Sequence, residues 1–318
     1  MGDRTTKYRI KSTLIKQSGD VSMRHKNLPS ILFFLTPAMI LLIVFVIYPV
    51  IQTLWLSFLS PDGEFVGLRN YLELLKSKEI INSDRFLTMS PPWGALVHNA
   101  VWIAIHLPLS VLLGLFFAII LKDVKGASIV KSMIFLGMVM PMVVGGLMAV
   151  FLFDKDIGIV NVILRLMGIH ALADISWVAH PETALIATIL SGVWMWTGFS
   201  MIVYSAALST IPREYYEAAE IDGASSFQKF IHITLPLLKP ATLVVIVMSV
   251  LYELKIFDII YVATLGGPGW SSNVLALLMY FKGFVYFKYN QAAALATLLT
   301  LLTLPPAIWI AKTAIGRK

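Results

Sequence analysis

The chain has 318 residues, of which 58% are hydrophobic and only 14% are charged, and its mean hydropathy is +0.81. A water-soluble domain of this length carries far more charge, so the composition indicates that lipid is the main solvent. The net charge is +7, but the basic residues lie beside apolar stretches, which argues against nucleic-acid binding. Without cysteine, the chain has no disulfides or thiolate metal sites.

Six apolar segments are each long enough to cross the hydrocarbon core, which takes roughly 20 helical residues. A basic tail over 1–27 precedes them and lacks the pattern of a cleavable signal peptide. Pro37 and Pro49 predict a kink or break in the first span. We therefore expect an all-α polytopic membrane protein with a permease domain over 28–311, a basic tail over 312–318, and transmembrane helices at about 28–58, 97–121, 132–153, 183–208, 241–263 and 289–311.

Lys and Arg are distributed unequally between the two sides of the membrane. With six spans both termini share one side, which carries sixteen of these residues against eight in the longer loops opposite. The positive-inside rule therefore predicts that both termini are cytoplasmic. It places the loops 60–96 and 154–182 outside, where the first is large enough to form a small cap, and a polar hairpin over 209–240 inside.

The polar segment 209–240 has the pattern of a helix–turn–helix. Pro212 suits the first position of a helix, and Gly223 tolerates the positive φ that ends one. Ser225 or Ser226 can cap a second short helix, which Pro236 would close. On the first helix, two small residues share a face with polar neighbours and would let another backbone approach closely; this face consists of Tyr215, Ala218, Ala219 and Asp222. An interfacial helix resting on lipid head groups is the alternative.

The spacing within this hairpin carries a resemblance to a known family. Glu217-Ala218-Ala219 is followed after three residues by Gly223, and after nine more by Ile233-Thr234-Leu235-Pro236. This matches, at every signature position, the cytoplasmic EAA motif of binding-protein-dependent ABC importer permeases. The resemblance covers about 28–311. Further segments resemble the carbohydrate branch, namely Ile211-Pro212, Ile221 to Ala224, Phe65 to Tyr71, and Phe257-Asp258 before Gly266-Gly267-Pro268.

The resemblance implies a type I importer subunit, similar to permeases for maltose, trehalose and other oligosaccharides, in a prokaryotic cytoplasmic (inner) membrane. Its implied partners are a second, homologous permease subunit, two ATPase subunits and an external solute-binding protein. The implied coupling residues are Glu217, Ala218, Ala219, Asp222 and Gly223, with Glu217 meeting the ATPase. The chain has no Gly-Lys dipeptide and hence no P-loop, so ATP and Mg²⁺ would be held by the partner ATPase. We expect a non-catalytic subunit without a cofactor or metal of its own.

The fifth span carries Glu253, Lys255 and Asp258 among apolar residues. Its apolar side chains favour insertion by roughly 4–8 kcal/mol, and three central charges oppose it by roughly 8–10 kcal/mol. The polar side should therefore face other helices or water. Lys255 and Asp258 are three apart and can pair.

An acid beside aromatic rings suits a sugar, because the rings stack on the sugar and the carboxylate accepts from its hydroxyls. Alternatively, Glu253 and Lys255 pair with the partner permease and the tryptophans only pack helices. The candidate substrate path comprises Glu253, Phe257, Asp258 and Tyr261 on the fifth span, with Trp194, Trp196, Phe199, Tyr204 and Ser205 on the fourth.

The isolated histidines His98, His106 and His232 lack metal-ligand spacing and indicate packing or helix-end roles. Gly114 and the pair Gly145-Gly146 indicate close helix contacts. Two alternatives to sugar import stay open. One is an ABC permease for another solute, such as glycerol phosphate or a polyamine. The other is an ion-coupled secondary transporter, which would normally need more helices or an inverted repeat.

Overall fold

The computed structural model describes residues 28–85 and 90–315, with side chains over 32–85 and 90–313. The basic tail expected over 1–27 lies outside the described residues, as does the end of the tail expected over 312–318. The described residues form helices and loops with one isolated β-bridge, between Leu59 and Phe65. They divide into two units, Met1–Trp55 and Leu56–Lys318.

The first unit is a single membrane-length helix, built from α2 (Leu28–Leu42), a π-helical turn η1 (Ile43–Ile47) and α3 (Tyr48–Leu56). It stays continuous over the 25 residues of its span, so the break expected from its prolines is absent. The π-helical turn lies between the two prolines, and in it Tyr48 N–H donates to the Ile43 carbonyl, five residues back. Such a wider turn lets a helix continue where proline supplies no N–H donor.

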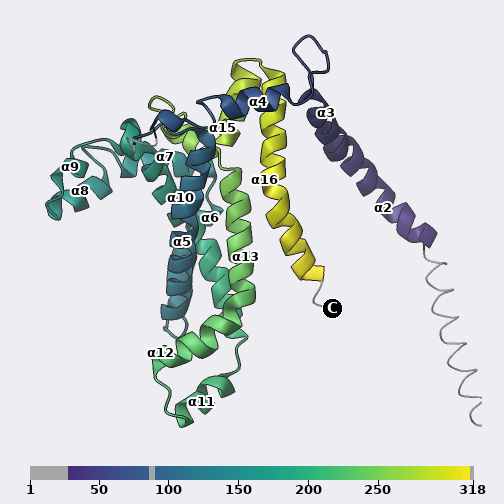
Figure 1. Ribbon diagram of the computed structural model, residues 1–318. Helices are drawn as coiled ribbons and strands as arrows, with labels where there is room; N and C mark the ends of the chain where they lie inside the picture. The colour runs from purple at the N-terminus through teal and green to yellow at the C-terminus, as the bar shows by residue number, and fades with distance from the viewer. Residues whose placement is uncertain (1–27, 86–89, 316–318) are drawn as a thin grey trace, which may run out of the picture. The chain divides into compact units, whose positions relative to one another are not determined.

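The second unit is a bundle around α10 (Pro181–Ser209), the most buried of its membrane-length helices. Around it pack α5 (Ala95–Ile120), α6 (Ala127–Val139), α7 (Met142–Leu152) and α13 (Leu235–Leu254), while α16 (Tyr289–Ile315) packs on α13 (Figure 1). The helices approach closely where they carry glycine. A Cβ added at Gly114 of α5 would lie 2.3 Å from the Ser200 Cβ of α10, which confirms the expected close contact.

The third span differs from the single helix expected over 132–153. It consists of α6 and α7, which meet at an angle of 104°. Pro141 follows Met140 at the bend, and a proline forces the residue before it into an extended conformation, here with ψ at 142°. Gly145 and Gly146 let α7 approach Met195 and Val262 closely, in agreement with the contacts expected of them.

The fifth span also differs from the expectation of 241–263. A continuous helical segment runs from α12 (Ser226–Lys229) through the π-helical turn η4 (Phe230–Thr234) to the end of α13 at Leu254. Pro236 therefore lies inside this helix and does not close a separate one; it is accommodated in the first turn of α13, directly after η4. The helix ends at Lys255, and α14 (Asp258–Ala263) begins after a short break.

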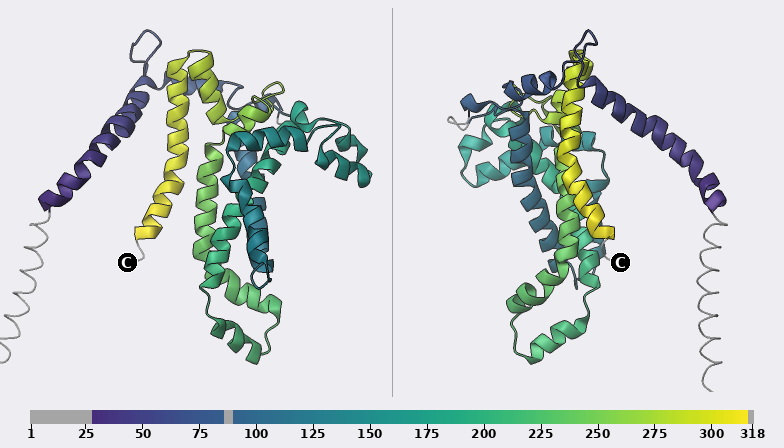
Figure 2. Two further views of the ribbon diagram at one scale, coloured as in Figure 1. Left: turned by 180° about the vertical axis from the view of Figure 1, so that it is seen from behind. Right: turned by 45° about the vertical axis from the view of Figure 1, so that its right-hand side comes forward.

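The remaining elements lie at two opposite ends of the bundle (Figures 1 and 2). The hairpin of α11 (Arg213–Ile221) and α12 lies at one end. The other end carries the segments of the loops 60–96 and 154–182, as the charge distribution requires of them. This second group contains α4 (Arg69–Lys76), η2 (Ser83–Arg85), α8 (Ile159–Leu166), α9 (His170–Ala173), η3 (Trp177–Ala179), α15 (Leu275–Tyr280) and η5 (Phe281–Val285).

Candidate coupling hairpin and substrate path

The α11–α12 hairpin is formed by the local signals expected of it. α11 starts directly after Pro212 and ends in a turn where Gly223 has a φ of +77°. Ser225 caps α12 in a reciprocal capping box, since its hydroxyl accepts from Gln228 N–H while the Gln228 side chain accepts from Ser225 N–H. Neither α11 nor α12 has a buried side chain. The hairpin is thus an ordered projection rather than part of the core.

The hairpin presents apolar as well as polar side chains to its surroundings. Ile221 is 87% exposed, Phe227 71% and Tyr215 54%. Such apolar side chains grouped on a small polar projection are typical of a surface that another protein covers. Of the predicted coupling residues, Glu217, Ala218, Asp222 and Gly223 are exposed and Ala219 is half-buried.

Three contacts join the hairpin to the bundle and hold it together. Lys229 Nζ lies 2.5 Å from Glu220 Oε1 and links α12 to α11, and this ammonium lowers the pKa of the Glu220 carboxyl. The Tyr216 hydroxyl lies 3.0 Å from Thr234 Oγ1, at the start of the fifth span. Lys122, just beyond the end of α5, lies over the Tyr216 ring at 5.0 Å. The hairpin is therefore in contact with the ends of two membrane helices.

Glu253 of the fifth span is fully buried against α5. Its Oε1 lies 2.6 Å from His106 Nδ1, and neither side chain is exposed. The Asn99 amide donates to the Glu253 carbonyl, while its oxygen accepts from Leu275 N–H at the start of α15. His98 accepts from Trp93 N–H and contacts the Asn273 carbonyl. Polar residues of α5 thus hold both ends of the segment that follows the break in the fifth span.

His106 is the buried partner of Glu253, and nothing in the residues near His106 in the sequence predicted this contact. Its partner lies 147 residues away, so local spacing contains no sign of the pair. The available signal is that an intramembrane carboxylate requires a polar partner on a neighbouring helix. His98, Asn99 and His106 supply such groups on α5.

Lys255 and Asp258 do not form the ion pair expected of them within the part of the chain that the structure describes. The expectation assumed a continuous helix, but Lys255 ends α13 and Asp258 begins α14. Both side chains are exposed.

The predicted aromatic residues form two separate groups. Phe257 stacks on Tyr261 at 5.2 Å, and Tyr280 makes edge contacts with both at 5.4 Å. On α10, Trp196 stacks at 4.2 Å on Tyr252, a residue not singled out from the sequence, and lies 5.0 Å from Phe199.

The other predicted residues of the fourth span lie apart from these groups. Trp194 is 39% exposed, Tyr204 is fully buried among residues of α5 and α13, and Ser205 is half-buried. Of the predicted path residues, the structure thus brings together Phe257 with Tyr261 and Trp196 with Phe199.

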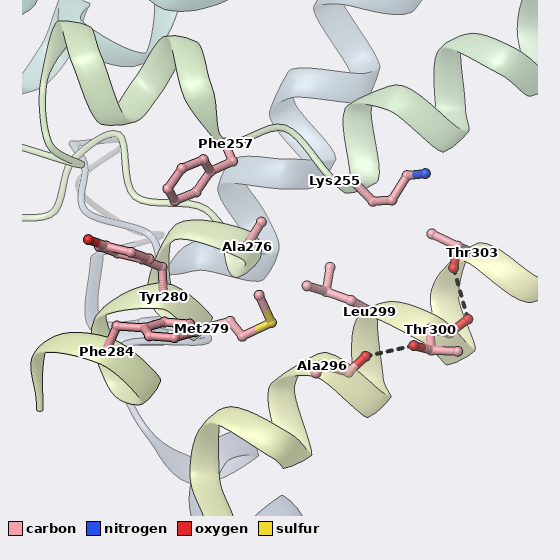
Figure 3. A pocket seen from close by; sticks show the side chains of 10 residues that line it. All are labelled: Lys255, Phe257, Ala276, Met279, Tyr280, Phe284, Ala296, Leu299, Thr300 and Thr303. Carbon is pink, nitrogen blue, oxygen red and sulfur yellow. Dashed lines mark hydrogen bonds between the residues drawn. The ribbon is translucent and has the colours of Figure 1, made fainter. Parts of the chain in front are cut away.

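A cavity of about 470 Å³ lies between α15, α16 and the break after α13 (Figure 3). Phe257 and Tyr280 line one side of it, and Lys255 is its one charged lining residue. Glu253 is turned away from this cavity towards α5. The full lining is Lys255, Phe257, Ala276, Met279, Tyr280, Phe284, Ala296, Leu299, Thr300 and Thr303. The described residues contain no cluster of three or more His, Asp or Glu that could hold a metal ion.

Within residues 28–85 and 90–315, five helices are long and apolar enough to cross a membrane, or six when the bent α6–α7 pair counts as one span. Together with the hairpin at one end of the bundle, they define a multi-span helical permease. The family model described as the binding-protein-dependent transport system inner membrane component matches residues 110–311, and the chain belongs to this family.

Known proteins with similar sequences or folds agree with this assignment. A probable ABC transporter permease of Pyrococcus horikoshii is 56% identical over 88% of this chain and 96% of its own length. The trehalose/maltose transport system permease protein MalF of Thermococcus litoralis is 34% identical over 84% of this chain and 88% of its own. A subunit of a bacterial ABC transporter that imports the acidic polysaccharide alginate has the same fold, with a TM-score of 0.71 at 23% identity, over 95% of this chain and 99% of that one.

Proposed function

We propose that this chain is the membrane-spanning permease subunit of an ATP-driven importer for a di- or oligosaccharide. In this proposal it works by alternating access in a prokaryotic cytoplasmic membrane, with a homologous second permease, two ATPase subunits and an external solute-binding protein. The ATPases bind ATP and Mg²⁺, and this chain performs no catalysis. Family membership and the similarity to a permease named for trehalose and maltose support the proposal.

The α11–α12 hairpin is the observation that carries this proposal. Its exposed apolar side chains suit contact with a protein partner, and four of its five predicted coupling residues are exposed. We assign Glu217 the contact with the ATPase, with Ala218 and Ala219 allowing close approach and Asp222 and Gly223 shaping the turn. Closure of the ATPases would then move the two hairpins of the assembly together.

The fifth span would transmit this movement into the membrane. It is a continuous helical segment from Ser226 to Leu254, interrupted only by the π-helical turn η4. A displacement at the hairpin would therefore be carried along this segment to the break at Lys255. The Glu253–His106 pair holds that break to α5. Glu253 would therefore act on the path by positioning the segment after the break, not by touching the sugar in this conformation.

The aromatic groups are the proposed contacts for the sugar. Phe257 and Tyr261 lie directly after the break, and Trp196 and Phe199 lie on the central helix, so each group offers ring faces for stacking. The exposed Asp258 carboxylate can accept from sugar hydroxyls. Trp194, Tyr204 and Ser205 stay predicted members of the path.

The test uses the chain with the subunits that co-purify with it, reconstituted in lipid. Because the chain has no cysteine, Ala218→Cys provides a single cross-linking site. We expect it to cross-link to the ATPase, and Glu217→Ala to lower ATPase stimulation by the binding protein with a saccharide. Glu214→Ala, at an exposed position on the same helix, is the matched control and should keep the stimulation. Absence of a cross-link, or equal activity of both variants, would contradict the coupling role.

A panel of solutes separates the sugar from its alternatives. We expect a di- or oligosaccharide to stimulate ATP hydrolysis, whereas glycerol phosphate or a polyamine should not. Glycerol phosphate belongs in the panel because Lys255 is the one charged residue that lines the cavity. Stimulation by the phosphate alone would replace the sugar proposal but leave the coupling role intact.

A further inference from the structure

Helix α8 has an unusual distribution of apolar side chains. On its inner side, Val160 and Leu164 pack against a core cluster that contains Phe153 and Trp177. Its opposite side, here called the outer face, is entirely apolar. The outer face consists of Ile159, Val162, Ile163 and Leu166, which are 57%, 43%, 50% and 84% exposed. This spacing of i, i+3, i+4 and i+7 is that of a helix face that is normally buried.

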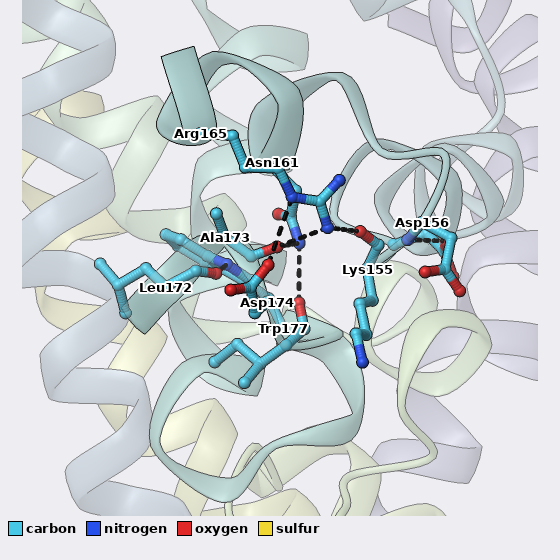
Figure 4. Close-up of polar contacts among 10 residues, drawn as sticks. Lys155, Asp156, Asn161, Arg165, Leu172, Ala173, Asp174 and Trp177 are labelled. Carbon is cyan, nitrogen blue, oxygen red and sulfur yellow. Dashed lines mark hydrogen bonds and ion pairs between the residues drawn. The ribbon is translucent and has the colours of Figure 1, made fainter. Parts of the chain in front are cut away.

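The polar groups of α8 point inward instead (Figure 4). Arg165, its one charged residue, donates to the Lys155 carbonyl at 2.7 Å and pairs with Asp174 at 3.3 Å. Asn161 is buried and donates to the carbonyls of Ala173 and Ile175. The loop around α8 is thus held together by internal polar contacts. Arg165 is half-buried and paired, whereas the apolar outer face is exposed, and such a helix is arranged for a surrounding that is not water.

The neighbouring span indicates that this surrounding is lipid. The exposed side of α7 is apolar as well, with Val143, Leu147 and Phe151 at a spacing of four residues. Because α7 belongs to a candidate membrane span, an exposed apolar side of this kind is suited to lipid, and α8 follows it in the chain. The charged segment 154–156 separates the two helices and marks the polar level of the membrane. Figures 1 and 2 show α8 and α9 projecting sideways from the end of the bundle.

We infer that the outer face of α8 is embedded in the lipid interface at the end of the bundle opposite the α11–α12 hairpin. In this position α8 lies along the membrane plane as an interfacial helix. Its attachment through Arg165 and Asn161 would hold the end of α7 at a fixed depth. The inference depends on membrane insertion of the chain and not on the transported solute.

The absence of cysteine makes a direct test possible, because one introduced cysteine carries one nitroxide label. The labelled positions are Leu166→Cys and Ile163→Cys on the outer face, both on exposed side chains whose replacement leaves the core intact. Phe151→Cys on α7 serves as the lipid-facing reference, and Asp156→Cys as the water-facing one. The full chain, with its co-purifying subunits, is placed in lipid nanodiscs. Collision of each label with oxygen and with a water-soluble nickel chelate is then measured.

We expect the labels at 163 and 166 to collide with oxygen and to be protected from the nickel chelate, as at 151. Collision with the chelate at both positions, as at 156, would show that the face lies in water and overturn the inference. Protection from both reagents would show that a protein subunit covers the face, which would overturn it as well.

Discussion

The buried contact between His106 and Glu253 allows a quantitative prediction. Both side chains are fully buried, and their polar atoms are 2.6 Å apart. His106→Leu would leave the Glu253 carboxyl inside the bundle without this partner. Removing one partner of a buried hydrogen bond leaves the other group unsatisfied and costs about 1–3 kcal/mol, whereas replacing both by apolar residues is often nearly neutral. We therefore expect a loss of about that size for His106→Leu and a much smaller loss for the double variant with Glu253→Leu.

Unfolding of the purified chain in mixed micelles, with rising sodium dodecyl sulfate and circular dichroism as the signal, measures these free energies. Glu253→Gln provides the control that keeps a hydrogen-bonding side chain beside His106, and it should cost about 1 kcal/mol. The reasoning is refuted if His106→Leu unfolds no more easily than the double variant. That result would mean that the two side chains do not depend on each other in the folded protein.

Three further predictions concern other contacts. Gly114→Ala places a Cβ against the Ser200 Cβ and also within 2.8 Å of the Met201 backbone nitrogen and 2.9 Å of the Ser200 carbonyl carbon, so it should cost about 1–3 kcal/mol in a thermal unfolding assay. Because the backbone contacts stay, Ser200→Gly in the same chain should restore only part of this loss; unchanged stability of Gly114→Ala would contradict the close packing. Asn290→Ala removes an amide that donates to three carbonyls between 56 and 60, so that segment should exchange its amide hydrogens faster, and unchanged exchange would argue against this anchor. The third prediction concerns the pKa of Glu220, which Lys229 lowers below 4.5. The stabilisation by this pair is therefore complete above 4.5 and is lost as the pH falls through the lower, folded-state pKa; a distance between spin labels on α11 and α12 that stayed constant throughout an acid titration from above pH 4.5 would disprove it.

Several features of this chain follow from short stretches of sequence. The spans could be located because about 20 apolar residues suffice to define a helix in lipid. The hairpin could be predicted in detail, since Gly223 fixes the turn after α11 and Ser225 the start of α12. The family resemblance could also be recognised from a short stretch, because the signature occupies only the twenty residues from Glu217 to Pro236.

Other features depended on the tertiary structure. The bend at Pro141 and the helix that continues through Pro236 contain the same residue type, and the sequence did not show which of these prolines would interrupt a span. The pair formed by His106 and Glu253 joins residues that are 147 positions apart. The break at Lys255 separates the side chains of Lys255 and Asp258, which a continuous helix would have placed side by side.

Sequence alone therefore determined the membrane class, the position of the α11–α12 hairpin and the family, because each depends on local composition or local spacing. The tertiary structure decided which buried charge meets which partner, which aromatic residues gather, and which face of α8 remains uncovered. These features depend on how helices pack against one another, and the packing energy is shared among residues that are distant in the chain.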